Sequence, residues 1–249
     1  FKRHSRRCGA MWPSKGGSQP DGGLVMTLRP AAVINATRVV RNREVNLTAP
    51  ARCICYAAVS ELACSPHDVD PRPALRDKIG NLGGLEYSQS LDGLLTEFVE
   101  IDLEQLKREY SGLFEVGSDG PPCPIREDLQ TGQRGGTRED IVRFYNYFNY
   151  KLGDDFAWAP DHLSVELEFM HYLCYREASA EDDQTSFQFA QIDFSERHLV
   201  RWVPEFARDV AATAEHSMYS RVIPIINDFL MADFAWQGKT VSTEESNQG

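Results

Sequence analysis

From about residue 50 to residue 234, apolar residues recur every three or four positions, and stretches of strict alternation are rare. This spacing gathers apolar side chains on one face of an α-helix, whereas a half-buried strand would require alternation. Ile54, Ala58 and Leu62 form such a stripe after Pro50, which a helix tolerates at its first position. The periodicity therefore predicts an all-α fold, a single domain of roughly seven to ten helices around one core.

The same pattern predicts where the later helices lie. Leu94 to Tyr110 continue the spacing within a second helical region, and Pro160-Asp161 opens a helix in which Asp161 occupies the first turn, at the positive end of the helix dipole. A proline inside a helix removes a hydrogen bond, so we expect a kink or restart at Pro204 and a break at Pro224. The expected helical ranges after the first are 92–110, 141–152, 160–177, 187–202 and 204–234.

Composition divides the chain into three parts. Residues 1–25 are basic, rich in Gly, Ser and Pro, and without a periodic apolar face, so we expect them to be disordered and dispensable. Residues 26–234 form the predicted helical domain, interrupted by a Pro/Gly-rich loop at 116–138 that holds three prolines in four positions. Residues 235–249 are predicted to be a polar tail.

The distribution of charge excludes several classes of partner. Beyond residue 50 the chain carries 17 basic and 35 acidic residues, which argues against a surface that neutralises nucleic-acid phosphates. No run of 18 apolar residues is present, so no membrane span is expected. Six cysteines in 249 residues are too few for a secreted disulfide scaffold, and no export signal follows Arg6-Arg7. A cytoplasmic protein is predicted.

Motifs for catalysis and cofactors are weak. The sequence lacks a phosphate-binding loop and a G-x-S-x-G nucleophile motif. Cys53 and Cys55 point about 200° apart on a helix, which disfavours a zinc site completed by Cys64 and His67. Glu168-x-x-His171 has the spacing of a di-iron ligand pair but has no second copy. We therefore expect no metal, no cofactor and no catalytic residue.

A conjunction of segments carries more information than any single motif. The segments are 109–117, the prolines at 121–124, the aromatic helix leading into 154–163, the Pro-Asp-His and Glu-Leu-Glu-Phe-Met segment at 160–170, and 190–204. Together they resemble redox-enzyme maturation chaperones of the TorD and NarJ type. The resemblance is closest to the chaperones, or delta subunits, of type II enzymes in the dimethyl sulfoxide reductase family. Asn149 stands at a turn that this family often closes with glycine, and asparagine tolerates the left-handed backbone conformation such a turn needs.

The resemblance implies a cytoplasmic, all-helical chaperone that is not an enzyme. Its implied partner is the molybdenum-containing catalytic subunit of such an enzyme, recognised through a twin-arginine leader and held until its cofactor is inserted and export can begin. The composition agrees with this, because a leader with a cationic head and an apolar body needs carboxylates beside an aromatic groove.

We expect the leader to bind where the proline loop meets the helix that starts at Pro160. A proline-rich loop cannot pair its backbone as a helix does, which would leave it available to a peptide. For the aromatic residues Tyr145 and Phe148, core packing and ligand contact remain equally open. The predicted client-binding residues are Tyr110, Phe114, Glu115, Pro121, Pro122, Pro124, Glu127, Asp161, His162, Glu166 and Phe169.

Two other functions stay open at this point. The first is a helical enzyme in which His162, Asp161 and Glu166 form an acid–base set, since residues four apart share a helix face. The second is a structural subunit that remains in a mature redox complex. The sequence identifies neither the client nor the oligomeric state, and it leaves binding of guanine nucleotide or molybdopterin open.

Overall fold

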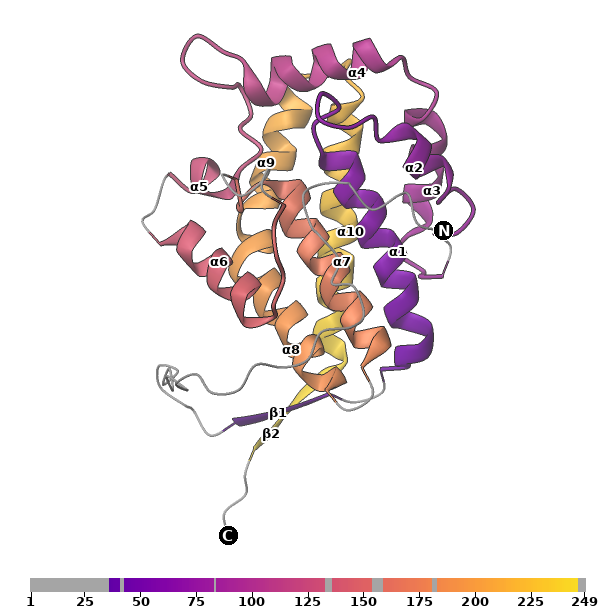
Figure 1. The fold of residues 1–249 in the computed structure, drawn as a ribbon, viewed down its shortest axis with the longest axis vertical. Helices are drawn as coiled ribbons and strands as arrows, with labels where there is room; N and C mark the ends of the chain where they lie inside the picture. Colours follow the sequence, from indigo (N-terminus) through magenta and orange to yellow (C-terminus); the bar gives the residue numbers. More distant parts are fainter. Residues whose placement is uncertain are drawn as a thin grey trace.

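A computed structural model of the chain describes residues 36–40, 43–82, 84–132, 136–153, 159–180 and 183–245. The predicted all-α fold is confirmed (Figure 1). The segment 1–25, expected to be disordered, lies outside the described residues. The helices are α1 (Val45–Ala63), α2 (Arg72–Arg76), α3 (Gln89–Phe98), α4 (Leu103–Tyr110), α5 (Glu127–Gln130), α6 (Thr137–Tyr147), α7 (Leu163–Ser179), α8 (Gln184–Phe194), α9 (Val200–Thr213) and α10 (Tyr219–Lys239), with π-helical turns η1 (Ser111–Glu115) and η3 (Ser195–Leu199).

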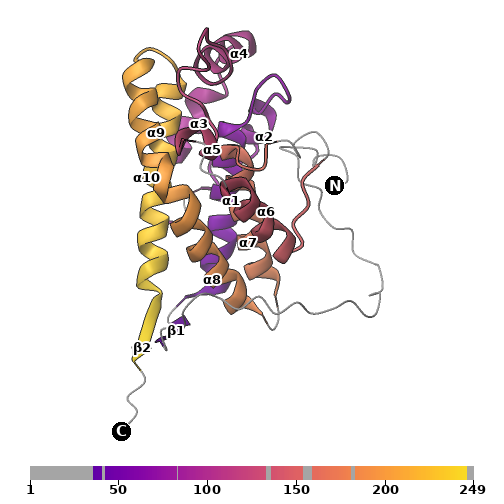
Figure 2. The same cartoon turned by 90° about the vertical axis from the view of Figure 1, so that its left-hand side faces the viewer.

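The antiparallel pair α1 and α7 forms the centre of the domain (Figure 1). The Ser60 hydroxyl donates to the carbonyl of Ser164 at one end of the pair, and Arg52 forms a salt bridge with Glu177 toward the other. α8 packs against α7, and α9 pairs with α10, which lie together at one side of the domain (Figure 2). Apolar side chains from these helices build one continuous core.

One predicted helix start and one predicted helical range are wrong in detail. α1 begins at Val45, so Pro50 lies inside the helix and not at its first position. The range 92–110 contains two helices, because the chain turns at 99–102 and the side chain of Asp102 then caps α4 by accepting a hydrogen bond from the Gln105 amide at 3.1 Å.

The predicted break at Pro224 is also wrong, since α10 passes through this residue. The chain reverses instead at 214–218, where the carboxylate of Glu109 accepts hydrogen bonds from the Met218 amide at 2.8 Å and the Ser217 hydroxyl at 2.7 Å. A carboxylate from α4 therefore satisfies the start of α10, which is a tertiary contact. At Pro204 the helix continues from η3 into α9 without restarting.

Part of the segment 235–249, predicted as a polar tail, belongs to regular secondary structure. α10 runs to Lys239, because the buried amide of Gln237 donates to Asp233 in the core at 2.6 Å. A short antiparallel ribbon of β1 (Ala36–Val40) and β2 (Val241–Glu245) follows, which the helical periodicity did not predict. Near α6, Asn149 has a φ of 55°, as the predicted turn requires.

Candidate functional site

The proline loop does meet the start of α7, and it uses its backbone to do so. The Cys123 amide donates to the carbonyl of Leu113 at 2.9 Å, and the Leu163 amide donates to the carbonyl of Ile125 at 3.2 Å. These bonds tie the loop to η1 on one side and to α7 on the other. The expectation that the loop backbone stays free for a peptide is therefore wrong at these positions. We call the region formed by 121–128 and 160–166 the junction.

Asp161 lies at the centre of the junction and is fully buried. It precedes α7 and is not in the first turn of the helix, contrary to the prediction. Its carboxylate forms ion pairs with Arg126 at 3.1 Å and Arg138 at 3.3 Å. Burial by itself would raise the pKa of Asp161, but the hydrogen bond to Asp128 and the charge of Arg126 outweigh it and hold the pKa below its ordinary value.

His162 is the N-cap of α7. Its Nδ1 accepts a hydrogen bond from the Ser164 amide at 3.2 Å, so the ring proton is on Nε2, which lies 3.0 Å from the hydroxyl of Tyr110. Burial lowers the pKa of His162 to about 4, which leaves the imidazole neutral near pH 7. Both ring nitrogens thus have structural partners.

Glu166 is fully buried. No well-aligned hydrogen bond reaches either of its carboxyl oxygens within the described part of the chain, and burial followed by repulsion from Glu127 raises its pKa well above the ordinary range. Glu127 in turn lies 2.9 Å from Nδ1 of His198. Asp161 and His162 therefore have partners of their own, and no hydrogen bond among the described residues joins the side chains of His162, Asp161 and Glu166 into the acid–base set that an enzyme would need.

Most of the predicted client-binding residues belong to the core. Tyr110, Phe114 and Phe169 pack in aromatic contacts inside the domain, and Glu127, Asp161 and Glu166 are buried beside them. These six side chains are enclosed and line no open surface of the described structure, and their contact with a client stays a prediction. The members that reach solvent are the exposed Glu115 and Pro122 and the half-buried Pro121, Pro124 and His162.

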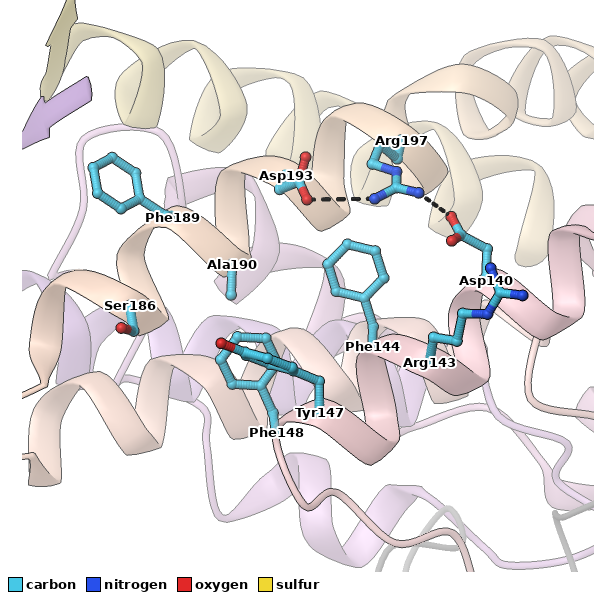
Figure 3. Close-up of a pocket in the computed structure, with 10 residues that line it drawn as sticks. All are labelled: Asp140, Arg143, Phe144, Tyr147, Phe148, Ser186, Phe189, Ala190, Asp193 and Arg197. Carbon is cyan, nitrogen blue, oxygen red and sulfur yellow. Dashed lines mark hydrogen bonds and ion pairs between the residues drawn. The ribbon is translucent and has the colours of Figure 1, made fainter. Parts of the chain in front are cut away.

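A groove between α6 and α8 offers the accessible aromatic surface (Figure 3). Phe144 and Phe148 form its floor together with Ala190, and Tyr147 stands at its edge with 81% of its surface exposed. The groove has a volume of about 730 Å³. Its lining residues are Asp140, Arg143, Phe144, Tyr147, Phe148, Ser186, Phe189, Ala190, Asp193 and Arg197. We call this surface the aromatic groove.

Arg197 spans the rim of the aromatic groove. Its guanidinium lies 2.5 Å from the carboxylate of Asp140 and 3.5 Å from that of Asp193, and its central carbon lies 5.1 Å from the ring centre of Phe144 (Figure 3). Two carboxylates and the face of an aromatic ring are the groups that bind a guanidinium best in proteins.

A polar chain connects the aromatic groove to the junction. Asp140 lies 3.4 Å from Nε2 of His198, and Nδ1 of the same ring lies 2.9 Å from Glu127. The Glu127 amide then donates to the carbonyl of Asp161 at 3.0 Å. The buried junction thereby lies next to the wall of the groove that carries Asp140.

Sequence reasoning singled out the aromatic helix but missed the groove that it forms. Phe144, Tyr147 and Phe148 have the i, i+3, i+4 spacing of one helix face, which was the available signal. Of the two residues left undecided, Tyr145 is core, whereas Phe148 lines the groove. The opposite wall comes from α8, more than 35 residues away, and no pattern in the sequence pairs these two segments.

The described part of the chain adds two further findings. It contains no group of three or more His, Cys, Asp or Glu side chains arranged to hold a metal ion. Among the same residues, none of the helices has the length and hydropathy that crossing a bilayer requires.

Comparison with known proteins adds independent information. Residues 84–208 match the family model described as nitrate reductase delta subunit. The chlorate reductase assembly chaperone of Ideonella dechloratans is 36% identical over 132 residues, covering 51% of this chain and 67% of that protein. The selenate reductase assembly chaperone of Thauera selenatis is 36% identical over 134 residues, covering 52% and 68%. A solved redox enzyme maturation protein from Archaeoglobus fulgidus aligns over 78% of this chain and 97% of its own, with a TM-score of 0.48 and 19% identity.

Proposed function

Because the chain belongs to the nitrate reductase delta subunit family, we propose that it is an assembly chaperone for the molybdenum-containing catalytic subunit of a redox enzyme. Relatives with 36% identity are assembly chaperones of chlorate and selenate reductases, and a relative with 22% identity is a TorD chaperone. The role is binding and not catalysis, in agreement with the separate structural partners of His162 and Asp161 and with the enclosed position of Glu166.

The finer proposal is that the client is a type II enzyme of the dimethyl sulfoxide reductase family and that its twin-arginine leader is bound before export, in the cytoplasm. The single observation that supports leader binding most is the aromatic groove between α6 and α8. Its floor of Phe144 and Phe148 suits the apolar body of a leader, and Asp140 and Asp193 suit its arginines. The exposed Tyr147 adds aromatic contact area that costs little conformational entropy on binding.

Calorimetry with a synthetic twin-arginine leader tests this proposal. We expect Tyr147→Ala to weaken binding about tenfold, or about 1.4 kcal/mol, without changing the melting temperature, because this side chain is 81% exposed. Tyr175→Ala is the matched control, since Tyr175 is an exposed tyrosine on α7 outside the groove. Equal affinity for Tyr147→Ala and the unaltered protein would remove the groove from the leader site.

Glu115→Gln tests the exposed edge of the junction in the same assay. If only this variant loses affinity, the leader binds at the junction edge, as the sequence analysis expected, and not in the groove. If the leader does not bind to the unaltered chain at all, leader recognition fails while the assembly role remains open. The molybdenum content of the client, purified from cells with and without this chain, then tests the assembly role directly.

A structural subunit would behave differently from a chaperone. It would purify in stoichiometric amounts with the mature, active enzyme, whereas we expect the chain to associate with the cofactor-free precursor and to be absent from the mature complex. Mass spectrometry of both forms of the client separates the two roles.

A further inference from the structure

The rim of the aromatic groove already contains one bound guanidinium, which belongs to the chain itself. Arg197 pairs with Asp140 and Asp193, which lie on opposite walls of the groove, and its guanidinium lies over the ring of Phe144. This arrangement shows that the groove has a subsite with the charge and shape for an arginine (Figure 3).

Arg197 is not held there by the core. Its side chain is 44% exposed, and ion pairs at such exposure contribute little to folding stability. It belongs to the π-helical turn η3, in which the next residue, His198, points inward to Glu127. A long exposed side chain changes rotamer rapidly and at low cost, so Arg197 can leave the subsite without disturbing the helix.

Asp140 remains supported when Arg197 leaves. Nε2 of His198 lies 3.4 Å from its carboxylate, without a well-aligned hydrogen bond, so Asp140 keeps a polar neighbour when the guanidinium moves away. Asp193 is nearly half exposed and stays hydrated without a partner. The subsite is therefore preformed for an arginine that arrives from outside.

We infer that Arg197 is an internal substitute for an arginine of the client, and that the incoming arginine displaces it from Asp140, Asp193 and Phe144. This inference rests on the proposed leader binding and adds to it a competition within the same site. The exchange of one guanidinium for another leaves the charge of the subsite unchanged. Occupancy by Arg197 therefore lowers affinity for the leader and rejects segments that offer only apolar contacts.

The test compares Arg197→Ala with the unaltered protein in leader binding by calorimetry. We expect the variant to bind a twin-arginine leader about tenfold more tightly, because no internal ion pair has to break. Arg201→Ala is the matched control, since it removes the same charge from a neighbouring exposed arginine on α9. The control separates the local effect from the general attraction between a more acidic protein and a cationic peptide.

A second peptide, in which both arginines are replaced by glutamine, completes the cycle. The tightening caused by Arg197→Ala should disappear with this peptide, because glutamine carries no charge for Asp140 and Asp193. The proposed competition would be overturned if Arg197→Ala bound both peptides more tightly by the same factor, or if Arg201→Ala gained as much affinity as Arg197→Ala. It would also be overturned if Arg197→Ala bound the twin-arginine leader no better than the unaltered protein. These results would leave leader binding itself intact. Failure of all three proteins to bind the twin-arginine leader would overturn leader binding together with the inference.

Discussion

Asp161 illustrates at the level of a single residue how a predicted contact residue can have a structural role. Its buried carboxylate neutralises Arg126 and Arg138, which come from different segments of the chain. The substitution Asp161→Asn keeps the shape but removes the charge, so both arginines lose their common partner.

We expect Asp161→Asn to lower the free energy of unfolding by about 2 kcal/mol, the usual range for a hydrogen-bonded charge. In a chain of this length that corresponds to a fall in melting temperature of roughly 4 to 8 °C. The exposed Glu205→Gln is the control and should stay within about 0.5 kcal/mol. A melting temperature unchanged from that of the unaltered protein would return Asp161 to the list of candidate contact residues.

Asp128 gives a prediction about pH. Burial, followed by hydrogen bonding to Asp161, raises its pKa to about 6, whereas an unfolded chain has an Asp pKa of about 3.9. Between these values the folded state keeps a proton that the unfolded state has lost. The stabilisation by this group is therefore present at low pH and is lost as the pH rises through about 6.

Asp128→Asn removes this dependence. The melting temperature of the variant, relative to the unaltered protein, should accordingly increase between pH 4.5 and pH 7.5. The ion pair between Asp128 and Arg126 needs the ionised carboxylate, and its effect is already included in the pKa of about 6. A difference that stays flat with pH, or falls, would show that Asp128 titrates normally.

At the level of helices, a buried network of charged and polar side chains joins four helices of the core, α1, α7, α8 and α10. Arg52 on α1 donates to Asp233 on α10 at 2.7 and 2.9 Å, to Gln191 on α8, and to Glu177 on α7. Burial alone would raise the pKa of Asp233, but the charge of Arg52 and its hydrogen bonds outweigh burial and keep the pKa below its ordinary value. Removing one member leaves an uncompensated buried charge.

Arg52→Met should therefore cost about 3 to 5 kcal/mol, and Asp233→Leu a similar amount. The double substitution should cost clearly less than the sum, because it removes both charges together. Denaturant unfolding of the three variants measures this coupling. Additive effects would mean that the two residues contribute independently, contrary to the geometry.

A second feature of the helices is the direction in which adjacent side chains point. The π-helical turn η3 lies between α8 and α9, and adjacent residues in it face opposite ways: Arg197 lies at the groove and His198 in the core. π-Helical turns occur frequently at functional sites. Here the turn places a groove residue and its buried support on one continuous element.

For the whole molecule, the excess of negative charge is the property with the widest consequence. A net charge of −11 attracts a cationic leader before contact is made, and this attraction is screened by salt. The Debye length falls from about 10 Å at 0.1 M to about 3 Å at 1 M salt.

Leader affinity should consequently fall several-fold between 0.1 M and 1 M sodium chloride, while the melting temperature should not fall, because salt also screens repulsion within the acidic domain. Parallel calorimetry and thermal unfolding separate the two effects. An affinity that does not change with salt would indicate that apolar contacts alone hold the leader.

The sequence by itself determined the fold class, because the α-helix is the regular structure that places apolar residues three and four positions apart on one face. Its motifs also identified the family. It also located the aromatic face of α6, since Phe144, Tyr147 and Phe148 are close along one helix. It could not determine helix ends such as the start of α10, which depends on the carboxylate of Glu109 from α4. A local pattern does not contain such contacts.

Only the tertiary structure decided which polar residues are buried and which are open. Asp161 and Glu166 have the residue types of a surface site, but packing against the arginines and the core encloses them. The groove, in turn, exists because α6 and α8 lie side by side, which brings Asp140 within reach of Arg197. Burial and charge pairing depend on all neighbours in space, and residues distant in sequence supply most of them.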